Sequence, residues 1–484
     1  MTDILHKIFR TLIAVYVFTL FYLWWQPVPE TPEPLVYRIS PAAATFFGDT
    51  TYYNDKGERV VSQTVWDEIF RLVAGARGYA LVDIGQLNDW QSLAENSAHP
   101  LAHEFVDHMI LGKESYPTST RIVIVDPLNT LYGGAPNAEL ERLENGGVTL
   151  RFTDTRRLYD ADLFYGAFWR AFLQWFGNSQ GGYLPHPLDH DGPDVSLRSW
   201  LEFLTMRMNE RAIIVADEND KTDSSGHKIV LFLTSRGATD RGSADISSGL
   251  SVRGKLWIEA LALERETAAK NGEALPMNVR GDANEEEGDL AASYLREGKV
   301  HLSLLGLLER ARSGDNIVIA WERLGDREVV DAIIRAENRG VSLQVLLDPN
   351  EHWMGYAQNG LPNSPVAVEL LGKSTGKLQV RYCAVRHEAC RPNFAFGTIG
   401  DKHFLLVGSG DLTRRDLRNF NLATAILLEH DTGSFPAYKE AEAFFNKLWV
   451  PAGEDGASGL AGPKNAWWHA SLYRFIERTG LSVF

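Results

Sequence analysis

The chain has 484 residues, of which 44% are hydrophobic and 11% are aromatic, so it can form two or more hydrophobic cores and is not disordered as a whole. Its formal net charge is −15 at pH 7. Because nucleic-acid binding depends on neutralising phosphates, this charge argues against a nucleic-acid partner.

An apolar run close to the N-terminus, residues 11–25, has the features of a membrane anchor. Lys7 and Arg10 precede the run, and Trp24 and Trp25 close it. Basic residues mark the cytoplasmic side of a membrane span, and tryptophans favour the interface. We therefore expect a single-pass anchor in the inner membrane, with a cytoplasmic N-terminus and a periplasmic or extracytoplasmic body. The alternatives are a cleaved signal peptide, although no cleavage pattern follows the run, and a buried N-terminal helix.

The rest of the chain alternates between strand and helix patterns, and the alternation occurs twice. Strands are expected over residues 79–84, 121–125, 148–152, 316–321 and 341–347, with helices over residues 65–73, 302–311 and 328–338. In each half a strand closes in a proline turn, at Asp126-Pro127 and at Asp348-Pro349. The repeated order of elements predicts an internal duplication and an α/β fold whose sheets are covered by helices.

Composition divides the chain into five parts. The polar, acidic stretch around residues 281–289 has no hydrophobic periodicity, which is typical of a solvated linker. The expected parts are an anchor and spacer (1–35), a first half (36–270), an acidic linker (271–290), a second half (291–450), and a linker with a C-terminal amphipathic helix (451–484).

Two expected hairpins end in similar sequences. They close in Leu-Thr-Ser-Arg-Gly (233–237) and Val-Gly-Ser-Gly-Asp (407–411), which resemble the Gly-Ser-x-Asn endings of the phospholipase D superfamily. From about residue 50 to residue 430, the order of elements is similar to that of bacterial, membrane-anchored, cardiolipin synthase-like members. The resemblance implies two pseudo-symmetric halves, each a mixed sheet flanked by helices, with one site between them. It also implies that Ser235 and Ser409 bind phosphate.

The same resemblance implies a His-x-Lys motif at the start of each hairpin, with an aspartate seven residues after the histidine. In that family one histidine attacks phosphorus, the other protonates the leaving alcohol, and the lysines hold the phosphoryl oxygens. Counting back from Asp217 and Asp401 gives Glu210-Arg211-Ala212 and Phe394-Ala395-Phe396. None of the 13 histidines has a lysine or arginine two residues later.

These replacements remove most of the chemistry that the motif supplies. Phe394 can neither attack phosphorus nor donate a proton, and Ala212 and Phe396 remove both lysines. Glu210 can donate a proton only where its surroundings raise its pKa. Arg211 is the nearest remaining cation and is the expected phosphate ligand. The motif positions Glu210, Ala212, Phe394 and Phe396 are therefore expected to form a degenerate site.

Other residues offer no clear replacement. A register one residue earlier places Asn209 and Asn393 at the histidine positions, and an amide is neither a base nor a nucleophile at neutral pH. His227, His387 and His403 lie near the hairpins, and we interpret them as ordinary loop or strand-edge residues because a catalytic group must come within hydrogen-bond reach.

The sequence therefore predicts a membrane-anchored, phospholipase D-like protein without phosphodiesterase activity, which binds phospholipid or phosphate or serves as a scaffold. One alternative is an active phospholipase D-type phosphodiesterase or phosphatidyltransferase similar to cardiolipin synthases. Another is a pseudoenzyme subunit that regulates an intact homologous partner. The expected partner is membrane phospholipid, and neither a cofactor nor a metal is expected.

Three further patterns leave alternatives open. Cys383 and Cys390 either close a short disulfide loop or remain two buried thiols. Residues 186–194 hold histidines and aspartates, which we interpret as a solvated loop rather than a metal site. The helix expected over residues 163–176 packs its aromatic side chains either into the core or against the bilayer.

Overall fold

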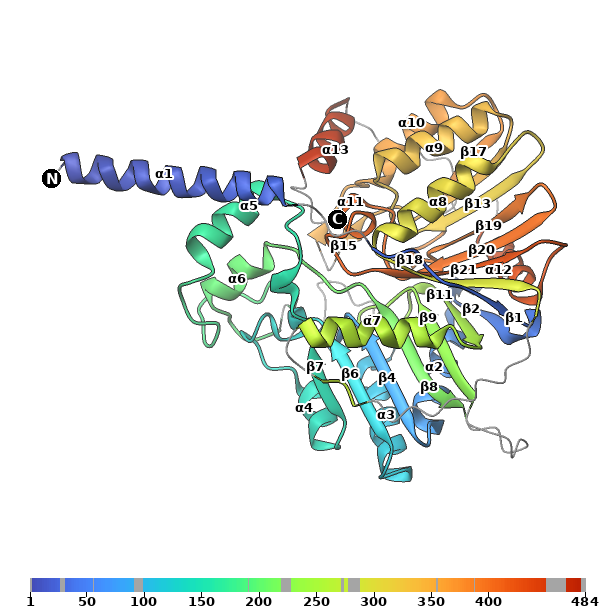
Figure 1. Ribbon diagram of the computed structural model, residues 1–484, viewed down its shortest axis with the longest axis horizontal. Coiled ribbons are helices and arrows are strands. Elements are labelled where there is room, and N and C mark those ends of the chain that lie inside the picture. Colours follow the sequence, from blue (N-terminus) through green and yellow to red (C-terminus); the bar gives the residue numbers. More distant parts are fainter. Residues whose placement is uncertain are drawn as a thin grey trace.

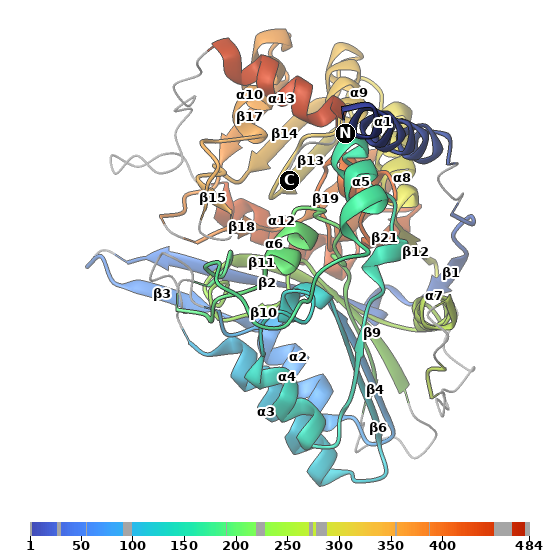
Figure 2. The same ribbon diagram turned by 90° about the vertical axis from the view of Figure 1, so that its left-hand side faces the viewer.

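Two large β-sheets face each other across a shared core, and helices cover their outer faces (Figures 1 and 2). The computed structural model describes residues 2–26, 31–54, 56–90, 99–189, 191–218, 228–270, 274–276, 288–353, 356–386, 388–449 and 467–479. The predicted linkers at 281–289 and 451–466 therefore lie almost wholly outside the described residues.

The first sheet is built from the first half of the chain. Its strands are β2 (Ala44–Tyr53), β3 (Arg59–Ser62), β4 (Tyr79–Ile84), β6 (Thr120–Val125), β7 (Thr149–Phe152), β8 (Ala212–Glu218), β9 (Lys228–Thr234) and β11 (Ile246–Arg253). They run in the order β3-β2-β11-β9-β8-β4-β6-β7. The pairs β4-β6 and β6-β7 are parallel and the others are antiparallel, so the sheet is mixed.

The second sheet repeats this plan. Its strands are β1 (Val36–Ile39), β12 (Leu290–Arg296), β13 (Asn316–Trp321), β14 (Ser342–Leu347), β17 (Leu378–Tyr382), β19 (Phe394–Ile399), β20 (Lys402–Gly408) and β21 (Thr424–His430). They run in the order β1-β12-β21-β20-β19-β13-β14-β17, again with two parallel pairs at one end. The order β7-β6-β4-β8-β9-β11 in the first sheet thus corresponds to β17-β14-β13-β19-β20-β21 in the second. The predicted duplication and mixed α/β halves are confirmed.

Alternation along the strands explains why each sheet is buried on both faces. On β8, Ile213 and Val215 point into the core between the sheets, whereas Ile214 and Ala216 point toward the outer helices. The outer helices lie at opposite ends of the molecule in Figure 2. They are α2 (Thr64–Gly75), α3 (Leu101–Ser115) and α4 (Ala138–Asn145) on the first sheet, and α8 (Gly298–Arg310), α9 (Arg327–Asn338) and α10 (Asn363–Lys373) on the second.

The remaining elements are short or lie at the edges of the sandwich. They are α5 (Leu163–Phe168), η4 (Trp169–Leu173), α6 (Leu197–Phe203), α7 (Trp257–Lys270), α11 (Arg414–Leu417), α12 (Pro436–Leu448), α13 (Trp467–Thr479), β5 (Leu87–Asn88), β10 (Ala238–Thr239), β15 (His352–Trp353), β16 (Tyr356–Ala357) and β18 (Cys390–Arg391), with single 3-10 turns η1 (Pro41–Ala43), η2 (Pro127–Thr130) and η3 (Thr155–Arg157).

The two halves exchange elements at their ends. β1 falls within the range expected for the first half, yet it pairs with β12 of the second sheet. In return α12, from the second half, packs on β2: the backbone N–H of Phe46 donates to Glu440, and the Phe46 and Phe444 rings lie 5.7 Å apart. The C-terminal helix α13 is present as predicted, and it packs on the second half through Tyr473, whose hydroxyl donates to the Gly325 carbonyl.

Among the described helices, α1 (Thr2–Trp25) is long and apolar enough to cross a membrane, with a mean hydropathy of 1.6. It projects away from the rest of the molecule (Figure 1). Its length and composition agree with the predicted anchor.

Candidate functional site

The start of each hairpin is held by the opposite half of the chain. In the first half Asn209, just before β8, forms a bridge with Leu422, and in the second half Cys390 of β18 pairs with Ile246 of β11. The two contacts are related by the duplication. They bring both hairpin starts to the interface between the sheets, where the family resemblance implies a site.

Matching hydrogen bonds show which residues of the two halves correspond. The carboxylate of Asp126 accepts from the Asn209 N–H, and the carboxylate of Asp348 accepts from the Cys390 N–H, each over 2.7 Å. Both aspartates belong to the predicted proline turns. Asn209 therefore corresponds to Cys390, so that the positions of Glu210 and Ala212 are matched by Arg391 and Asn393.

This correspondence corrects the second motif expected from sequence. Phe394 and Phe396 lie in the core between the sheets, where both are at most 2% exposed and where their rings stack on each other. They correspond to strand positions beyond the motif. The second motif was misplaced because Asp401 was aligned with Asp217. Asp401 lies in the two-residue turn between β19 and β20. Asp217 lies on β8 and accepts hydrogen bonds from the backbone N–H groups of Gly78 and Tyr79.

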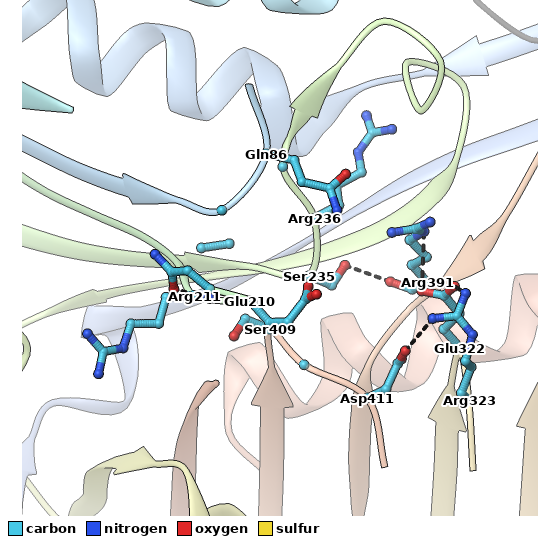
Figure 3. A pocket seen from close by; sticks show the side chains of 15 residues that line it. Gln86, Glu210, Arg211, Ser235, Arg236, Glu322, Arg323, Arg391, Ser409 and Asp411 are labelled. Atoms are coloured by element: carbon cyan, nitrogen blue, oxygen red, sulfur yellow. Dashed lines mark hydrogen bonds and ion pairs between the residues drawn. The ribbon is translucent and has the colours of Figure 1, made fainter. Parts of the chain in front are cut away.

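A small pocket of about 40 Å³ opens between the two motif positions (Figure 3). The sequence suggested a crevice lined by methyl, phenyl and acidic groups, but guanidinium groups take the place of the phenyl rings. Its lining consists of Gly85, Gln86, Asn209, Glu210, Arg211, Ala212, Ser235, Arg236, Gly237, Glu322, Arg323, Arg391, Ser409, Gly410 and Asp411. Neither histidine nor lysine occurs among these described residues.

Two arginines from the second half contribute positive charge to the pocket, in addition to Arg236 and Arg211 of the first half. Arg391 contacts Glu322 over 3.2 Å and Asp245 over 3.6 Å. Arg323 contacts Glu322 over 2.6 Å and Asp411 over 2.7 Å. Burial by itself would lower the pKa of both guanidinium groups, but the surrounding carboxylates raise it, so both stay charged. Sequence reasoning missed both arginines.

Two carboxyl groups of the pocket favour their protonated forms. Burial, reinforced by Asp416 and Asp411, raises the pKa of Glu210 well above its usual value. Burial and the nearby Glu322 likewise raise the pKa of Asp411. Glu210 thus has the raised pKa that a proton donor requires. When Glu210 and Asp411 are protonated, they no longer compensate the positive charge of the nearby arginines.

Arg211, the cation expected from sequence, points away from this charge cluster (Figure 3). Its guanidinium binds Glu264 over 3.1 Å and Glu297 over 2.8 Å. Although burial would lower its pKa, these carboxylates raise it. Because Glu264 belongs to the first half and Glu297 to the second, Arg211 joins the two halves, and Arg391 is the cation that faces Glu210.

Ser235 and Ser409 both line the pocket as expected, and their hydroxyls bond to the backbone. Ser235 donates to the Arg391 carbonyl over 2.6 Å, which fixes the segment that carries Arg391. Ser409 accepts from the Thr424 N–H over 3.1 Å. Direct phosphate binding by either serine remains a prediction.

The other histidines considered from sequence do not approach the pocket where they are described. His403 is near the far end of β20, six residues before Ser409, which is about 20 Å along a strand. His227, His387 and His190 lie outside the described residues. The loop predicted to be solvated is buried in part, at His186 and Leu188. Burial lowers the pKa of His186 to about 4. Within the described part of the chain no cluster of three metal-ligating side chains occurs.

Cys383 and Cys390 form a disulfide, with Cα atoms 6.3 Å apart. Because β18 carries Arg391 directly after Cys390, the bond also fixes one wall of the pocket.

We expect the Cys383→Ser, Cys390→Ser variant to lose roughly 2–3 kcal/mol of unfolding free energy, the loop-entropy value for so short a loop. Urea unfolding in detergent, with and without reductant, measures this loss. Equal stability of the variant and the oxidised protein would contradict it.

Comparisons with known proteins agree with the fold. Residues 304–449 match the family model described as "Cardiolipin synthase, PLD-like domain". The crystal structure of phosphatidylserine synthase from Haemophilus influenzae Rd KW20 superposes with a TM-score of 0.52 and 11% identity, over 92% of this chain and 95% of that one. Residues 304–449 thus resemble a phospholipase D-like domain, and the chain shares its fold with that synthase. No curated protein matches its sequence.

Two further solved structures align with this chain at lower scores. Polyphosphate kinase from Porphyromonas gingivalis aligns over 94% of this chain with 13% identity and a TM-score of 0.47, and the chain spans 57% of the kinase. NucT from Helicobacter pylori aligns over 33% of this chain and 95% of its own length, with 18% identity and a TM-score of 0.25.

Proposed function

We propose that this chain is a membrane-anchored, catalytically inactive phospholipase D-like protein that binds the phosphate group of an anionic phospholipid in the pocket between its halves. The observation that carries the proposal is the pair of corrected motifs, Glu210-x-Ala212 and Arg391-x-Asn393. The basic residues Lys7 and Arg10, in the N-terminal part of α1, support a cytoplasmic N-terminus and a periplasmic body in the inner membrane.

The four motif residues lack the groups that phosphodiester cleavage requires. Arg391 is permanently charged and has no lone pair with which to attack phosphorus. Asn393 is bound within the fold, since its Oδ1 accepts from the Glu322 N–H and its Nδ2 donates to the Gly410 carbonyl. Ala212 carries no charge. Glu210 alone retains a proton-donating function, and a proton donor without a nucleophile does not complete the reaction.

The same residues favour binding of a phosphate anion. Arg391 offers a planar pair of donors, which suits phosphate oxygens. Since the pKa values of Glu210 and Asp411 are raised, both groups are neutral at lower pH, and their deprotonation adds repulsive charge as the pH rises. Phosphate affinity is therefore expected to fall with increasing pH.

The test uses the full chain in vesicles that contain phosphatidylglycerol and cardiolipin, with an active phospholipase D as the reference for the assay. We expect no release or transfer of lipid products above the vesicle background, together with binding of a soluble phosphodiester headgroup, glycerophosphoglycerol, that weakens from pH 5 to pH 8. A phosphodiester keeps one negative charge over this range, so the change reports on the protein. Lipid turnover by the unmodified chain that disappears in the Glu210→Gln variant would refute inactivity. Headgroup binding that is unaffected by pH would refute the proposed pocket chemistry.

A further inference from the structure

The segment from Leu163 to Phe176 forms the predicted helix but leaves much of its aromatic surface uncovered. It begins as α5, continues as the π-helical turn η4 and closes in a turn. Four aromatic side chains, here called the aromatic face, remain exposed: Phe164 by 52%, Phe168 by 43%, Trp175 by 71% and Phe176 by 72%. Only part of the segment therefore packs into the core, in particular Trp169, which is 2% exposed.

The polar groups next to this face are bonded within the protein. Arg170, the single charged residue between 163 and 176, donates to the Asp160 carboxylate over 2.5 Å and to the Leu158 carbonyl over 2.8 Å. The carboxylate of Asp162 accepts from the first free N–H groups of α5, each over 3.0 Å. The Trp175 indole donates to the Arg170 carbonyl. Such internal pairing is what a segment in contact with hydrocarbon requires.

The aromatic face is continuous with the apolar helix α1. The Tyr16 hydroxyl donates to the Phe164 carbonyl over 3.3 Å, and Leu23 is 8% exposed although the adjacent Trp24 is 69% exposed. One side of the C-terminal half of α1 thus packs on the body. Tyr16 lies nine residues before Trp25, or about 14 Å along a helix axis. If Trp24 and Trp25 mark the interface, the contact with Phe164 lies at hydrocarbon depth.

We propose that the aromatic face is a second membrane contact, inserted into the acyl chains of the leaflet next to the body while α1 crosses the bilayer. The partner is lipid rather than protein because the face extends an apolar helix surface that itself requires lipid. Trp175 and Phe176 are residues that suit the boundary between headgroups and acyl chains. Two contacts fix the orientation of the body relative to the membrane, which a single flexible anchor does not.

The test places nitroxide spin labels on the full-length protein in nanodiscs. Phe168→Cys and Phe176→Cys report on the aromatic face, Phe18→Cys on α1 is the lipid reference, and Tyr52→Cys on β2 is the aqueous reference. Phe18 and Tyr52 are 73% and 54% exposed, comparable to the tested positions. The unsubstituted chain, whose two cysteines form a disulfide, controls for background labelling. Collisions with oxygen report lipid, and collisions with a charged nickel chelate report water.

We expect the oxygen-to-chelate collision ratio at positions 168 and 176 to resemble that at position 18 and to exceed that at position 52 several-fold. Strong collision with the nickel chelate at both positions, with position 18 still in lipid, would overturn the proposal. Weak collision with both reagents would also overturn it, because the face would then be covered by protein. Because lipid depth is measured independently of phosphate binding, neither result depends on the proposed function of the pocket.

Discussion

Replacing Arg391 with methionine is expected to weaken headgroup binding roughly tenfold to a hundredfold, the effect of losing a charge-assisted hydrogen bond. Arg391 faces Glu210 across the pseudo-twofold interface, lines the pocket, and has a side chain that is 20% exposed. Its removal leaves Glu322 and Asp245 with less compensation inside the protein. We therefore also expect about 3 kcal/mol of destabilisation, as for breaking a buried ion pair.

The two effects can be separated by a matched variant. Arg391→Lys keeps the charge that compensates the carboxylates but loses the planar pair of donors. It should retain most of the stability while binding the headgroup less tightly than the native protein. Calorimetric titration with glycerophosphoglycerol and urea unfolding measure the two quantities. Native affinity in Arg391→Met would show that the phosphate site lies elsewhere.

Replacing Arg211 with methionine is expected to be the most destabilising single change, with a loss of about 3–5 kcal/mol of unfolding free energy. Arg211 is 2% exposed and compensates Glu264 and Glu297, and it also lies 3.9 Å from Asp83. These carboxylates belong to both halves. Loss of the guanidinium would therefore weaken the interface between the sheets as well as leave buried negative charge unpaired.

The unfolding free energy lost by the Arg211→Met variant should increase as the pH rises. Burial already raises the pKa of Asp83 and Glu264, so the folded state binds protons more tightly than the unfolded state. In the variant the penalty for ionising them is small below the unfolded pKa near 4 and grows as pH rises through the folded values. Unfolding in urea at pH 5 and pH 8 should show the greater loss at pH 8.

A surface arginine provides the control for this effect. Arg157 pairs with Asp154 while its side chain is 58% exposed, and such pairs contribute about 0–1 kcal/mol. Arg157→Met should therefore unfold almost as the native protein does at both pH values. A similarly small effect of Arg211→Met would contradict its role in joining the halves.

The elements that could be predicted from sequence are those with a local pattern. Strand 79–84 and strand 316–321 have the predicted bounds exactly, because apolar runs and proline turns are local signals. The second motif was misplaced because an aspartate in a turn was matched to an aspartate on a strand. Aligning the apolar runs that start at Ile213 and Phe394 would have placed Arg391 opposite Glu210.

The remaining features of the site depend on contacts that sequence does not display. Arg323 reaches the pocket from the end of β13, and its partner Asp411 comes from beyond β20, 88 residues later. Whether Arg211 or Arg391 faces the pocket depends on which side of the backbone each points to. That direction is set by pairing across the interface, as in the bridge between Asn209 and Leu422.

The disulfide has a counterpart of different chemistry in the other half. Thr153 and Cys383 occupy equivalent positions, since their N–H groups donate to Val125 and Leu347 at the ends of β6 and β14. Thr153 accepts a hydrogen bond from Asn209 over 3.0 Å, at the place where Cys383 is joined to Cys390. A change in the thiol-disulfide balance of the compartment would therefore loosen one wall of the pocket and leave the other unaffected.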